Sequence, residues 1–304
     1  EFSCREERLS TYLVTGATGS LGQALVGRLL RDGAERIVIY SRDEQKQDAM
    51  ARELNHDPRN PADPLRFFLG DVRDRDRLAL AMRGVENVVH AAALKIVPKL
   101  EYDPSEAVKT NVVGSMNVVD AALATPSVRR VVGVSSDKGS APLNLYGATK
   151  LCMERLFVAA NAYSGAGGPR FACVRYGNVT GSRGSVVGVW ADAALRGEPL
   201  LLTDPGATRF WITLDEAVDF VLSSLERMRG GEVFVPRLPA SRVADLAAAV
   251  APNNGVRTVG LRPGEKLHEQ ILSEAEARRA LRLNGSGRIV VPPYQHDEMW
   301  DVRP

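Results

Sequence analysis

The stretch TGATGSLG, residues 15–22, decides the fold class of this 304-residue chain. Its glycines have the spacing G-x-x-G-x-x-G, and it lies between an apolar segment at residues 12–14 and a segment at residues 23–31 with apolar side chains at helical spacing. Glycines at this spacing allow a tight turn, let backbone N–H groups approach a pyrophosphate and place a helix N-terminus beside its charge. The stretch therefore predicts a dinucleotide-binding loop between a strand and a helix.

Strand-like and helix-like segments alternate through the first 176 residues. Short apolar segments predict further strands at residues 37–40, 65–69, 87–91, 131–135 and 171–176. The segments between them predict helices at residues 75–83, 105–124 and 146–163. This alternation indicates an α/β fold with a Rossmann-like, doubly wound parallel sheet covered by helices on both faces.

The pattern changes after Tyr176, where Gly and Ser become frequent. Beyond it the sequence predicts helices at residues 215–228, 243–250 and 273–281 and a short strand at residues 232–236. We expect residues 11–176 and 207–238 to form the cofactor-binding Rossmann domain, and residues 177–206 and 239–304 to form a smaller, discontinuous C-terminal substrate lobe. This lobe should cover the C-terminal strand ends, where open α/β sheets bind ligands. The Pro-rich residues 56–64 predict a surface loop.

The composition and charge of the chain argue against several classes of protein and of binding partner. A formal net charge of +2 with interspersed acidic and basic residues gives no electrostatic reason to expect nucleic acid or an acidic membrane as partner. The longest apolar runs have the length of strands, and the N-terminus lacks the pattern of a signal peptide. Cysteines at positions 4, 152 and 173, far apart and without a His cluster, argue against a disulfide framework and a metal site. We expect a cytoplasmic protein.

The end of the second predicted strand distinguishes NADP from NAD. Chains that bind NAD usually have an acidic residue there, whereas this chain has Ser41 followed by Arg42, which can bind a 2′-phosphate. In the alternative, Arg42 stacks over the adenine and Asp43 binds the ribose of NAD. NADP is favoured. The expected cofactor site comprises the glycine loop, the strand ends and the two catalytic residues described next: Gly16, Thr18, Gly19, Ser20, Leu21, Gly22, Ser41, Arg42, Asp71, Val72, Ala91, Ala93, Tyr146 and Lys150.

Tyr146 and Lys150 are one turn apart on a predicted helix and so share a face. A lysine ammonium and an oxidised nicotinamide both favour phenolate. Lowering the pKa of a tyrosine from near 10 to near 7 takes about 4 kcal/mol, which the two together can supply. Tyr146 is therefore a candidate general base for oxidising an alcohol. Asp137 and Lys138, after Ser136 at a strand end, are two further acid–base candidates that a plain dehydrogenase does not need.

Several motifs together resemble a known family. TGATGSLG, HAAALK, the Tyr146/Lys150 pair and RYGNVTGSRGSVV resemble the extended short-chain dehydrogenases/reductases over nearly the whole chain from Thr11. Within that family, YSRDEQKQ, SSDKGSAPLNLYGATK and TRFWITLDEAVDFV look like the inverting UDP-N-acetylglucosamine 4,6-dehydratases. Retaining nucleotide-sugar dehydratases carry Thr-Asp-Glu where this chain has Ser136-Asp137-Lys138.

The resemblance implies a lyase that recycles NADP within one turnover. Tyr146 would take the O4 proton while the C4 hydride goes to NADP⁺, Lys138 would remove the C5 proton, and Asp137 would assist loss of the C6 hydroxyl as water. Hydride return to C6 would give a 4-keto-6-deoxy sugar with C5 inverted. Because a base must be unprotonated, Lys138 would then need a lowered pKa.

The resemblance also implies the residues that bind the UDP-sugar. Arg262 would contact the pyrophosphate, Glu265 the uridine ribose, and Ser136 the substrate O4. Homo-oligomers through the helices at residues 105–124 and 146–163 are implied as well. Further expected contacts are Lys95, Asn178 and Arg209, whereas we expect His90 to be a packed core residue.

Three alternatives stay open at this level. Gly139-Ser140 stands where the dehydratase pattern has Ala-Asn, which leaves room for a 5,6-dehydratase that returns hydride to C4 and releases a 5,6-ene. A UDP-hexose 4-epimerase would use Tyr146 and Lys150 but not Asp137 and Lys138. A sensor that binds NADP without turnover is a different class, and the intact Tyr146, Lys150 and Asp137 argue against it.

Overall fold

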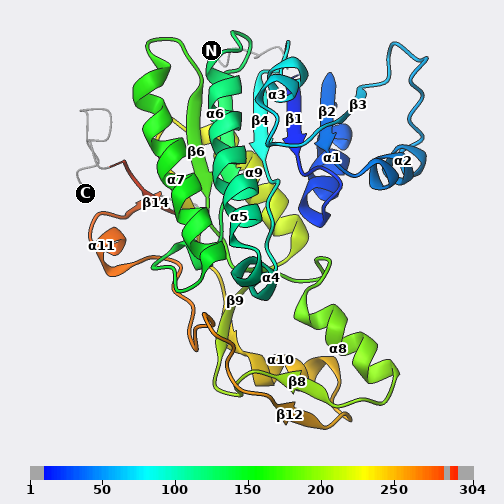
Figure 1. Ribbon diagram of the computed structural model, residues 1–304, viewed down its shortest axis with the longest axis vertical. Coiled ribbons are helices and arrows are strands. Elements are labelled where there is room, and N and C mark those ends of the chain that lie inside the picture. The colour runs from blue at the N-terminus through cyan, green and yellow to red at the C-terminus, as the bar shows by residue number, and fades with distance from the viewer. Residues whose placement is uncertain (1–9, 284–287, 294–304) are drawn as a thin grey trace, which may run out of the picture.

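A nine-stranded, mostly parallel sheet forms the centre of the molecule, as the computed structural model in Figure 1 shows for residues 10–283 and 288–293. Its strand order is β13-β14-β10-β6-β5-β4-β1-β2-β3. All neighbours from β3 to β10 pair in parallel, which confirms the Rossmann-like sheet. The parallel strands are β1 (Thr11–Thr15), β2 (Arg36–Ser41), β3 (Leu65–Leu69), β4 (Asn87–His90), β5 (Arg130–Val134), β6 (Arg170–Val174) and β10 (Val233–Pro236).

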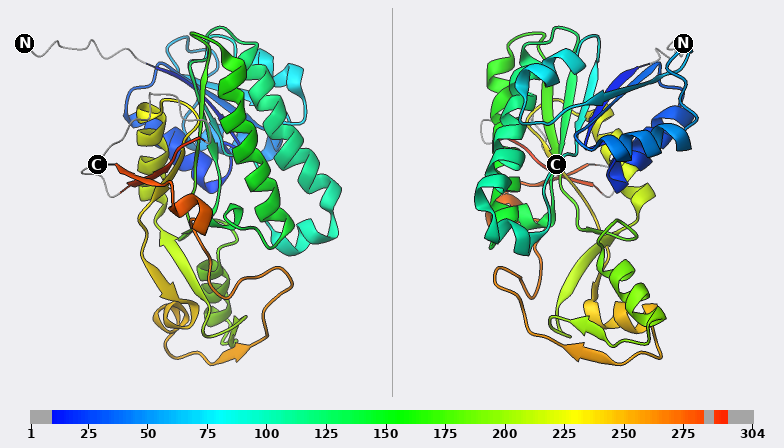
Figure 2. Two further views of the ribbon diagram at one scale, coloured as in Figure 1. Left: turned by 90° about the vertical axis from the view of Figure 1, so that its left-hand side faces the viewer. Right: turned by 45° about the vertical axis from the view of Figure 1, so that its right-hand side comes forward.

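Helices cover both faces of this sheet (Figure 2). Alternate residues of each strand point to opposite faces, so Val14 and Val132 belong to one apolar cluster and Leu13 and Val131 to the other. The strands are apolar almost throughout because both faces are buried. The first cluster includes α1 (Ser20–Arg31), α2 (Glu44–Glu53) and α9 (Leu214–Arg227). The second includes α3 (Arg75–Ala81), α6 (Gly114–Leu123) and α7 (Leu145–Ser164).

The helix expected at residues 105–124 is interrupted. It consists of α5 (Pro104–Ala107), a π-helical segment (Val108–Val113) and α6, and it follows a short helix α4 (Val97–Tyr102). Wide turns of this kind frequently occur at functional sites. Here the π-helical segment carries the buried Asn111.

A smaller lobe lies below the C-terminal ends of the parallel strands (Figures 1 and 2). It has its own apolar cluster, which includes Trp190, Leu200 and Leu202. It contains a three-stranded sheet of β11 (Ala240–Arg242), β9 (Thr208–Ile212) and β7 (Asn178–Val179), a strand pair of β8 (Leu200–Leu202) and β12 (Val256–Thr258), and the helices α8 (Val186–Leu195) and α10 (Val243–Val250).

The C-terminal segment departs from the expected helix and from the expected lobe. The helix predicted for residues 273–281 is wrong in extent, because only α11 (Glu274–Ala277) is helical and Leu281 begins β13 (Leu281–Leu283). β13 and β14 (Arg288–Val291) form an antiparallel pair that extends the large sheet beside β10. Strand β9, in turn, joins the smaller lobe's sheet rather than the large one. Residues 284–287 and 294–304 of the expected substrate lobe lie outside the described residues.

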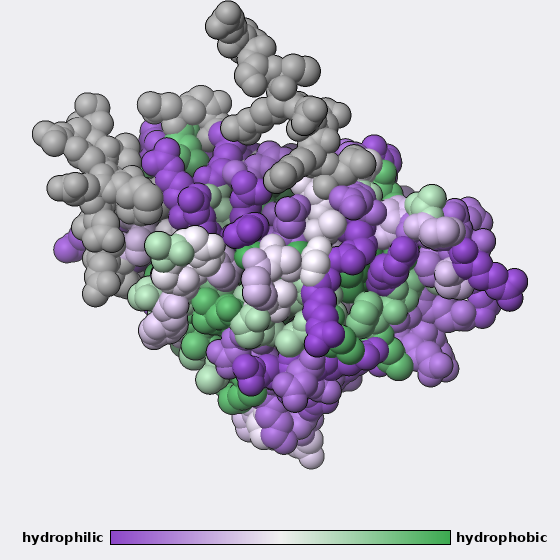
Figure 3. Space-filling view, turned by 90° about the horizontal axis from the view of Figure 1, so that it is seen from above, coloured by the Kyte–Doolittle hydropathy of each residue, from purple (hydrophilic) through white to green (hydrophobic). Residues whose placement is uncertain are grey.

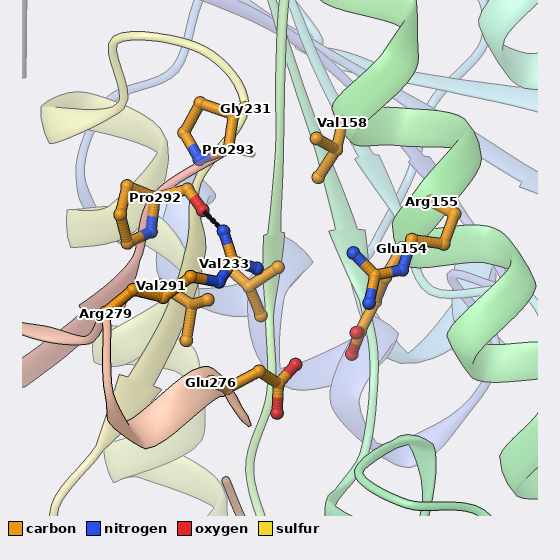
Figure 4. A pocket seen from close by; sticks show the side chains of 10 residues that line it. All are labelled: Glu154, Arg155, Val158, Gly231, Val233, Glu276, Arg279, Val291, Pro292 and Pro293. Atoms are coloured by element: carbon orange, nitrogen blue, oxygen red, sulfur yellow. Dashed lines mark hydrogen bonds between the residues drawn. The ribbon is translucent and has the colours of Figure 1, made fainter. Parts of the chain in front are cut away.

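A buried ion cluster fastens this C-terminal segment to the sheet. Arg175, just after β6, is fully buried and contacts Glu154 of α7 at 2.5 Å and Glu276 of α11 at 2.9 Å. Figure 4 shows the side chains of Glu154 and Glu276 facing each other from α7 and from the C-terminal segment. Each carboxylate holds a charge that would be costly to bury alone, so the three residues stabilise one another.

Within the described ranges, no helix is both long and apolar enough to cross a membrane. Seen from the end opposite the smaller lobe, the surface is mostly hydrophilic with scattered apolar residues (Figure 3). Residues 56–64 form the expected loop, in which Asp63 bonds His56 at 2.7 Å.

Candidate active site

The glycine loop has the geometry that a dinucleotide pyrophosphate requires. Gly16 has a φ of +67°, and a Cβ there would lie 2.8 Å from the Cα of Ala92. Its N–H donates to Tyr40 O at 2.9 Å, and the N–H of Gly19 donates to Gly16 O at 2.9 Å. Helix α1 begins at Ser20 with Gly19 as its N-cap, so the N-cap residue has no side chain to cover the first-turn amides. The loop therefore fits a bound pyrophosphate.

A substitution at Gly22 is expected to have a measurable effect on stability. A Cβ at Gly22 would lie 2.5 Å from both Gly16 O and Ala17 Cα, which are backbone atoms that cannot move aside. We expect Gly22→Ala to lower the free energy of unfolding by about 1–3 kcal/mol in denaturant titration. The control is Gly27→Ala in the same helix, where the nearest atom, of the flexible Arg31, is 3.7 Å away. This control should gain about 0.5–1 kcal/mol, and equal effects at the two sites would contradict the steric argument.

Arg183, from the smaller lobe, forms hydrogen bonds with the glycine loop. Arg183 donates from its guanidinium to Thr18 O at 2.7 Å and from its backbone N–H to Ser20 Oγ at 3.0 Å. Its carbonyl accepts from the Nζ of Lys95 at 3.4 Å, and burial together with the Arg183 charge lowers the pKa of Lys95. Sequence reasoning missed Arg183; its place in the quoted segment RYGNVTGSRGSVV was the available signal.

The residues expected at the adenine end gather beyond β2 and β3. Arg42 is exposed and lies 3.6 Å from Asp71, which also pairs with Arg73 at 2.8 Å. Ser41 is buried, and its hydroxyl accepts from Gln47 at 3.1 Å. Asp43 caps α2 through Lys46 N and pairs with Lys46 Nζ at 2.5 Å. Asp43 is thus engaged in its own helix, while the guanidinium of Arg42 is open to solvent.

Tyr146 and Lys150 lie one turn apart at the start of α7, as expected. The N-cap Asn144 accepts from Gly147 N at 2.8 Å, which fixes where the helix begins. Lys150 is buried and donates to Val134 O at 2.7 Å, and burial lowers its pKa to about 8. Burial raises the pKa of Tyr146 despite the opposing effects of Lys138 and a hydrogen bond with Ser136. In the protein alone, burial therefore outweighs these two effects, and the lowering of this pKa by Lys150 together with an oxidised nicotinamide stays a prediction.

Asp137 and Lys138 form an ion pair beside Tyr146, in which Asp137 is buried and Lys138 is partly exposed. Asp137 is completely buried; its Oδ1 accepts from Ser136 Oγ at 2.9 Å and from Lys138 Nζ at 3.2 Å. Its Oδ2 has no hydrogen-bond partner among the described residues. This orphaned oxygen is available to a proton or a ligand group.

Glu269 is the residue of this group that sequence reasoning missed. Its buried carboxylate lies 3.2 Å from Lys138 Nζ. Burial alone would lower the pKa of Lys138, but Asp137 and Glu269 outweigh it and raise that pKa. The lowered pKa that Lys138 would need as a base is therefore absent in the protein alone, because Asp137 and a carboxylate from a distant segment both favour the ammonium. Glu269 lies three residues beyond the RPGEK motif of residues 262–266, and this proximity, in RPGEKLHE, was the available signal.

The segment containing this motif packs on the beginning of α7. Asn144 donates to Gly264 O at 2.9 Å, and Lys266 donates to Ser140 O at 2.8 Å. Of the expected substrate residues, Arg209 and Glu265 meet in a salt bridge of 2.7 Å. Arg262 is exposed beside them, with its N–H 3.3 Å from the carboxylate of Glu265. Asn178 is placed on β7 opposite Trp211 of β9.

Two buried polar residues, Asn111 and His90, form hydrogen bonds between the elements around the site. Asn111 accepts from Leu94 N at 2.8 Å and donates to Leu94 O and Thr149 Oγ1, so it joins the loop after β4 to α7. Sequence reasoning missed Asn111. His90 is buried as expected; burial lowers its pKa to about 3, and its ring contacts Thr15 Oγ1 at 2.8 Å. In the described part of the chain, no group of three His, Cys, Asp or Glu side chains could hold a metal.

Comparisons with known proteins agree with this geometry. The family described as polysaccharide biosynthesis protein matches residues 12–290. The inverting UDP-N-acetylglucosamine 4,6-dehydratase of Campylobacter jejuni is 48% identical over 267 residues, 87% of this chain and 78% of that protein. A UDP-glucose 4-epimerase of Rickettsia typhi is 40% identical over 287 residues, 92% of this chain and 82% of that protein.

A solved structure agrees as well. DesIV, a dTDP-glucose 4,6-dehydratase from Streptomyces venezuelae solved with NAD bound, superposes with a TM-score of 0.76 at 25% identity, over 95% of this chain and 93% of that one. A dinucleotide-binding loop is therefore common to the fold and to this chain. The chain is homologous to a hydro-lyase and belongs to the polysaccharide biosynthesis protein family of extended short-chain dehydrogenases/reductases.

Proposed function

We propose that this chain is an NADP-dependent UDP-N-acetylglucosamine 4,6-dehydratase of the inverting type. The observation that carries the proposal is the ion pair of the buried Asp137 with Lys138 beside Tyr146. Oxidation at C4 needs a single base, whereas loss of water across C5 and C6 needs a second base and an acid. The 48% identity to a dehydratase of this type supports the same conclusion.

Each residue has a role in the proposed reaction that follows from its position in the site. Tyr146, with Ser136 beside it, accepts the O4 proton, and Lys150 holds the end of β5 against α7 through Val134 O. Bound NADP⁺ would accept the C4 hydride and return it to C6. Asp137 and Lys138 exchange protons with C5 and with the C6 oxygen. Arg262, Glu265, Arg209, Asn178 and Lys95 are proposed to bind the UDP-sugar, whose non-reacting part supplies binding energy.

NMR of the protein with UDP-N-acetylglucosamine in D₂O tests the reaction directly. A new C6 methyl, deuterium at C5 and a hydrated 4-ketone are the expected signals, and the C5 coupling would show inversion. A vinylic C6 signal with hydrogen retained at C4 would instead identify the 5,6-dehydratase. Unchanged substrate would discard this sugar and favour the sensor.

The second candidate is a UDP-hexose 4-epimerase, because the Rickettsia typhi relative bears such a name and Tyr146 and Lys150 suffice for that reaction. An epimerase inverts C4 without exchanging C5 hydrogen for deuterium. Formation of the C4 epimer with C5 hydrogen retained would therefore replace the dehydratase proposal. The buried Asp137, with one unpartnered oxygen, would then have no chemical use.

Arg42 is proposed to select NADP over NAD. Charge-assisted hydrogen bonds to a 2′-phosphate contribute about 1.5–3 kcal/mol, so Arg42→Ala should weaken NADP binding by about 10–100-fold and leave NAD binding nearly unchanged. Fluorescence titration with both reduced cofactors measures this ratio. Arg59→Ala, in the exposed 56–64 loop, is the matched control. Equal weakening of NAD and NADP would show that Arg42 contacts the adenine instead.

Self-association is proposed through the helices on the α6–α7 side. The helical stretch that leads into the first turn of α6 carries exposed apolar side chains, with Val108 40% exposed, Val113 39% and Met116 44%. Apolar residues gathered on one surface commonly mark an interface. A cytoplasmic location stays a prediction from the sequence.

A further inference from the structure

Arg183 reaches from the smaller lobe to the cofactor loop at the tip of a tight turn. Ser185 N donates to Ser182 O at 2.9 Å, and Gly184 has a φ of +72°, a backbone conformation that favours glycine. The backbone N–H of Arg183 donates to Ser20 Oγ at 3.0 Å, which holds the turn against the first residue of α1. The turn therefore presents the Arg183 side chain to the helix that follows the glycine loop.

The guanidinium of Arg183 lies at the N-terminal end of α1. It donates to Thr18 O at 2.7 Å, just before the N-cap Gly19, and to Gln23 Oε1 at 3.0 Å in the first turn. Both of these acceptors are neutral. In Rossmann-type folds the pyrophosphate of a dinucleotide binds at this end of the helix, because its backbone N–H groups and its dipole favour an anion. The charge of Arg183 is therefore beside the expected position of the two phosphates.

A second cation lies beside Arg183. The Nζ of Lys95, from the loop after β4, donates to Arg183 O at 3.4 Å, and burial and then the charge of Arg183 lower the pKa of Lys95. Among the described residues, neither cation forms an ion pair with a carboxylate. The charge of Arg183 also acts on Asp43, but that carboxylate pairs with Lys46 at 2.5 Å. Two neighbouring cations without a carboxylate partner repel each other, and a bound anion offsets this cost.

We propose that Arg183 binds the pyrophosphate of the dinucleotide, so that the smaller lobe supplies a cofactor-binding residue. A guanidinium suits this ligand because its planar donors match two phosphate oxygens at once. Lys95 adds a second positive charge on the same side. The inference rests on the dinucleotide site of the proposed function and holds whichever sugar the enzyme converts. A cofactor held by both parts of the molecule suits a reaction in which it is recycled without leaving.

The test is fluorescence titration of NADPH and of NADH into the wild type and Arg183→Ala. Both cofactors contain the pyrophosphate, so the variant should bind each of them about 10-fold more weakly, unlike Arg42→Ala. Arg183→Gln can still donate to Thr18 O but has no charge, so it should be as weak as Arg183→Ala, and Arg183→Lys should recover part of the affinity. Adenosine 2′-monophosphate has no pyrophosphate and should compete equally well in all variants. Arg257→Ala, exposed on β12 of the same lobe, is the matched control.

Other outcomes would overturn the inference. If Arg183→Gln binds both cofactors as the wild type does, Arg183 only holds the lobe against α1. If adenosine 2′-monophosphate is weakened as much as NADPH, the substitution has altered the whole cofactor site. If Arg183→Ala weakens binding of UDP, measured by calorimetry, and leaves NADPH unchanged, the anion is the diphosphate of the sugar nucleotide. A wild type that binds NADPH but does not convert the sugar would refute the proposed dehydration alone, whereas one that binds neither cofactor would refute both proposals.

Discussion

Tyr146→Phe should lower kcat for the dehydration by about 10²–10⁴-fold, the range that a positioned general base contributes. The phenylalanine ring fills the same space but has no oxygen to accept the O4 proton. Oxidation at C4 precedes every later step, so reduced cofactor at 340 nm, C5 deuteration and the C6 methyl should all be lost together. Stopped-flow absorbance and NMR in D₂O measure these three signals.

The control for this variant lies on the same helix. Tyr163 is 73% exposed near the C-terminal end of α7, so Tyr163→Phe should leave the rate unchanged. An unchanged rate of C4 oxidation in Tyr146→Phe would contradict the assignment. Another group near O4 would then be the base, and Ser136, which hydrogen-bonds with Tyr146, would be the next to test.

Asp137→Asn should separate the oxidation at C4 from the loss of water across C5 and C6. Asparagine has the same shape and still accepts from Ser136 and Lys138, but it cannot take or give the catalytic proton. Oxidation at C4 should continue, because Tyr146 and Lys150 are intact, while water loss falls by about 10²–10⁴-fold. We expect reduced cofactor to accumulate with a 4-keto sugar that still carries its C6 hydroxyl.

Asp120→Asn, exposed on α6, is the matched control and should behave as the wild type. If Asp137→Asn loses water at the wild-type rate, Asp137 takes no part in proton transfer. If C4 oxidation is lost as well, Asp137 acts through Tyr146, and the epimerase reading gains support. Deuterium at C5 gives a third measure, since it reports whether the C5 proton is still removed when Asp137 is replaced by asparagine.

Local patterns in the sequence were sufficient to predict most of the fold. The glycine spacing at residues 15–22 and the alternation of short apolar segments with helical ones predicted the parallel sheet and the position of its cofactor loop. The pairing of Tyr146 with Lys150 followed from helical geometry over a single turn. Each of these features depends on residues close together in the chain, so the chain's path through space does not alter them.

Only the tertiary structure showed that a second carboxylate lies beside the Nζ of Lys138. Asp137, the sequence neighbour of Lys138, and Glu269, from a segment that packs on the start of α7, together raise the pKa of Lys138, and no pattern near Lys138 predicts the contact with Glu269. The hairpin of β13 and β14 was equally hidden, because Leu281 becomes a strand residue only when Val290 lies beside it. A local pattern fixes which face of an element is apolar, whereas a pKa and a strand pairing depend on groups brought together from distant parts of the chain.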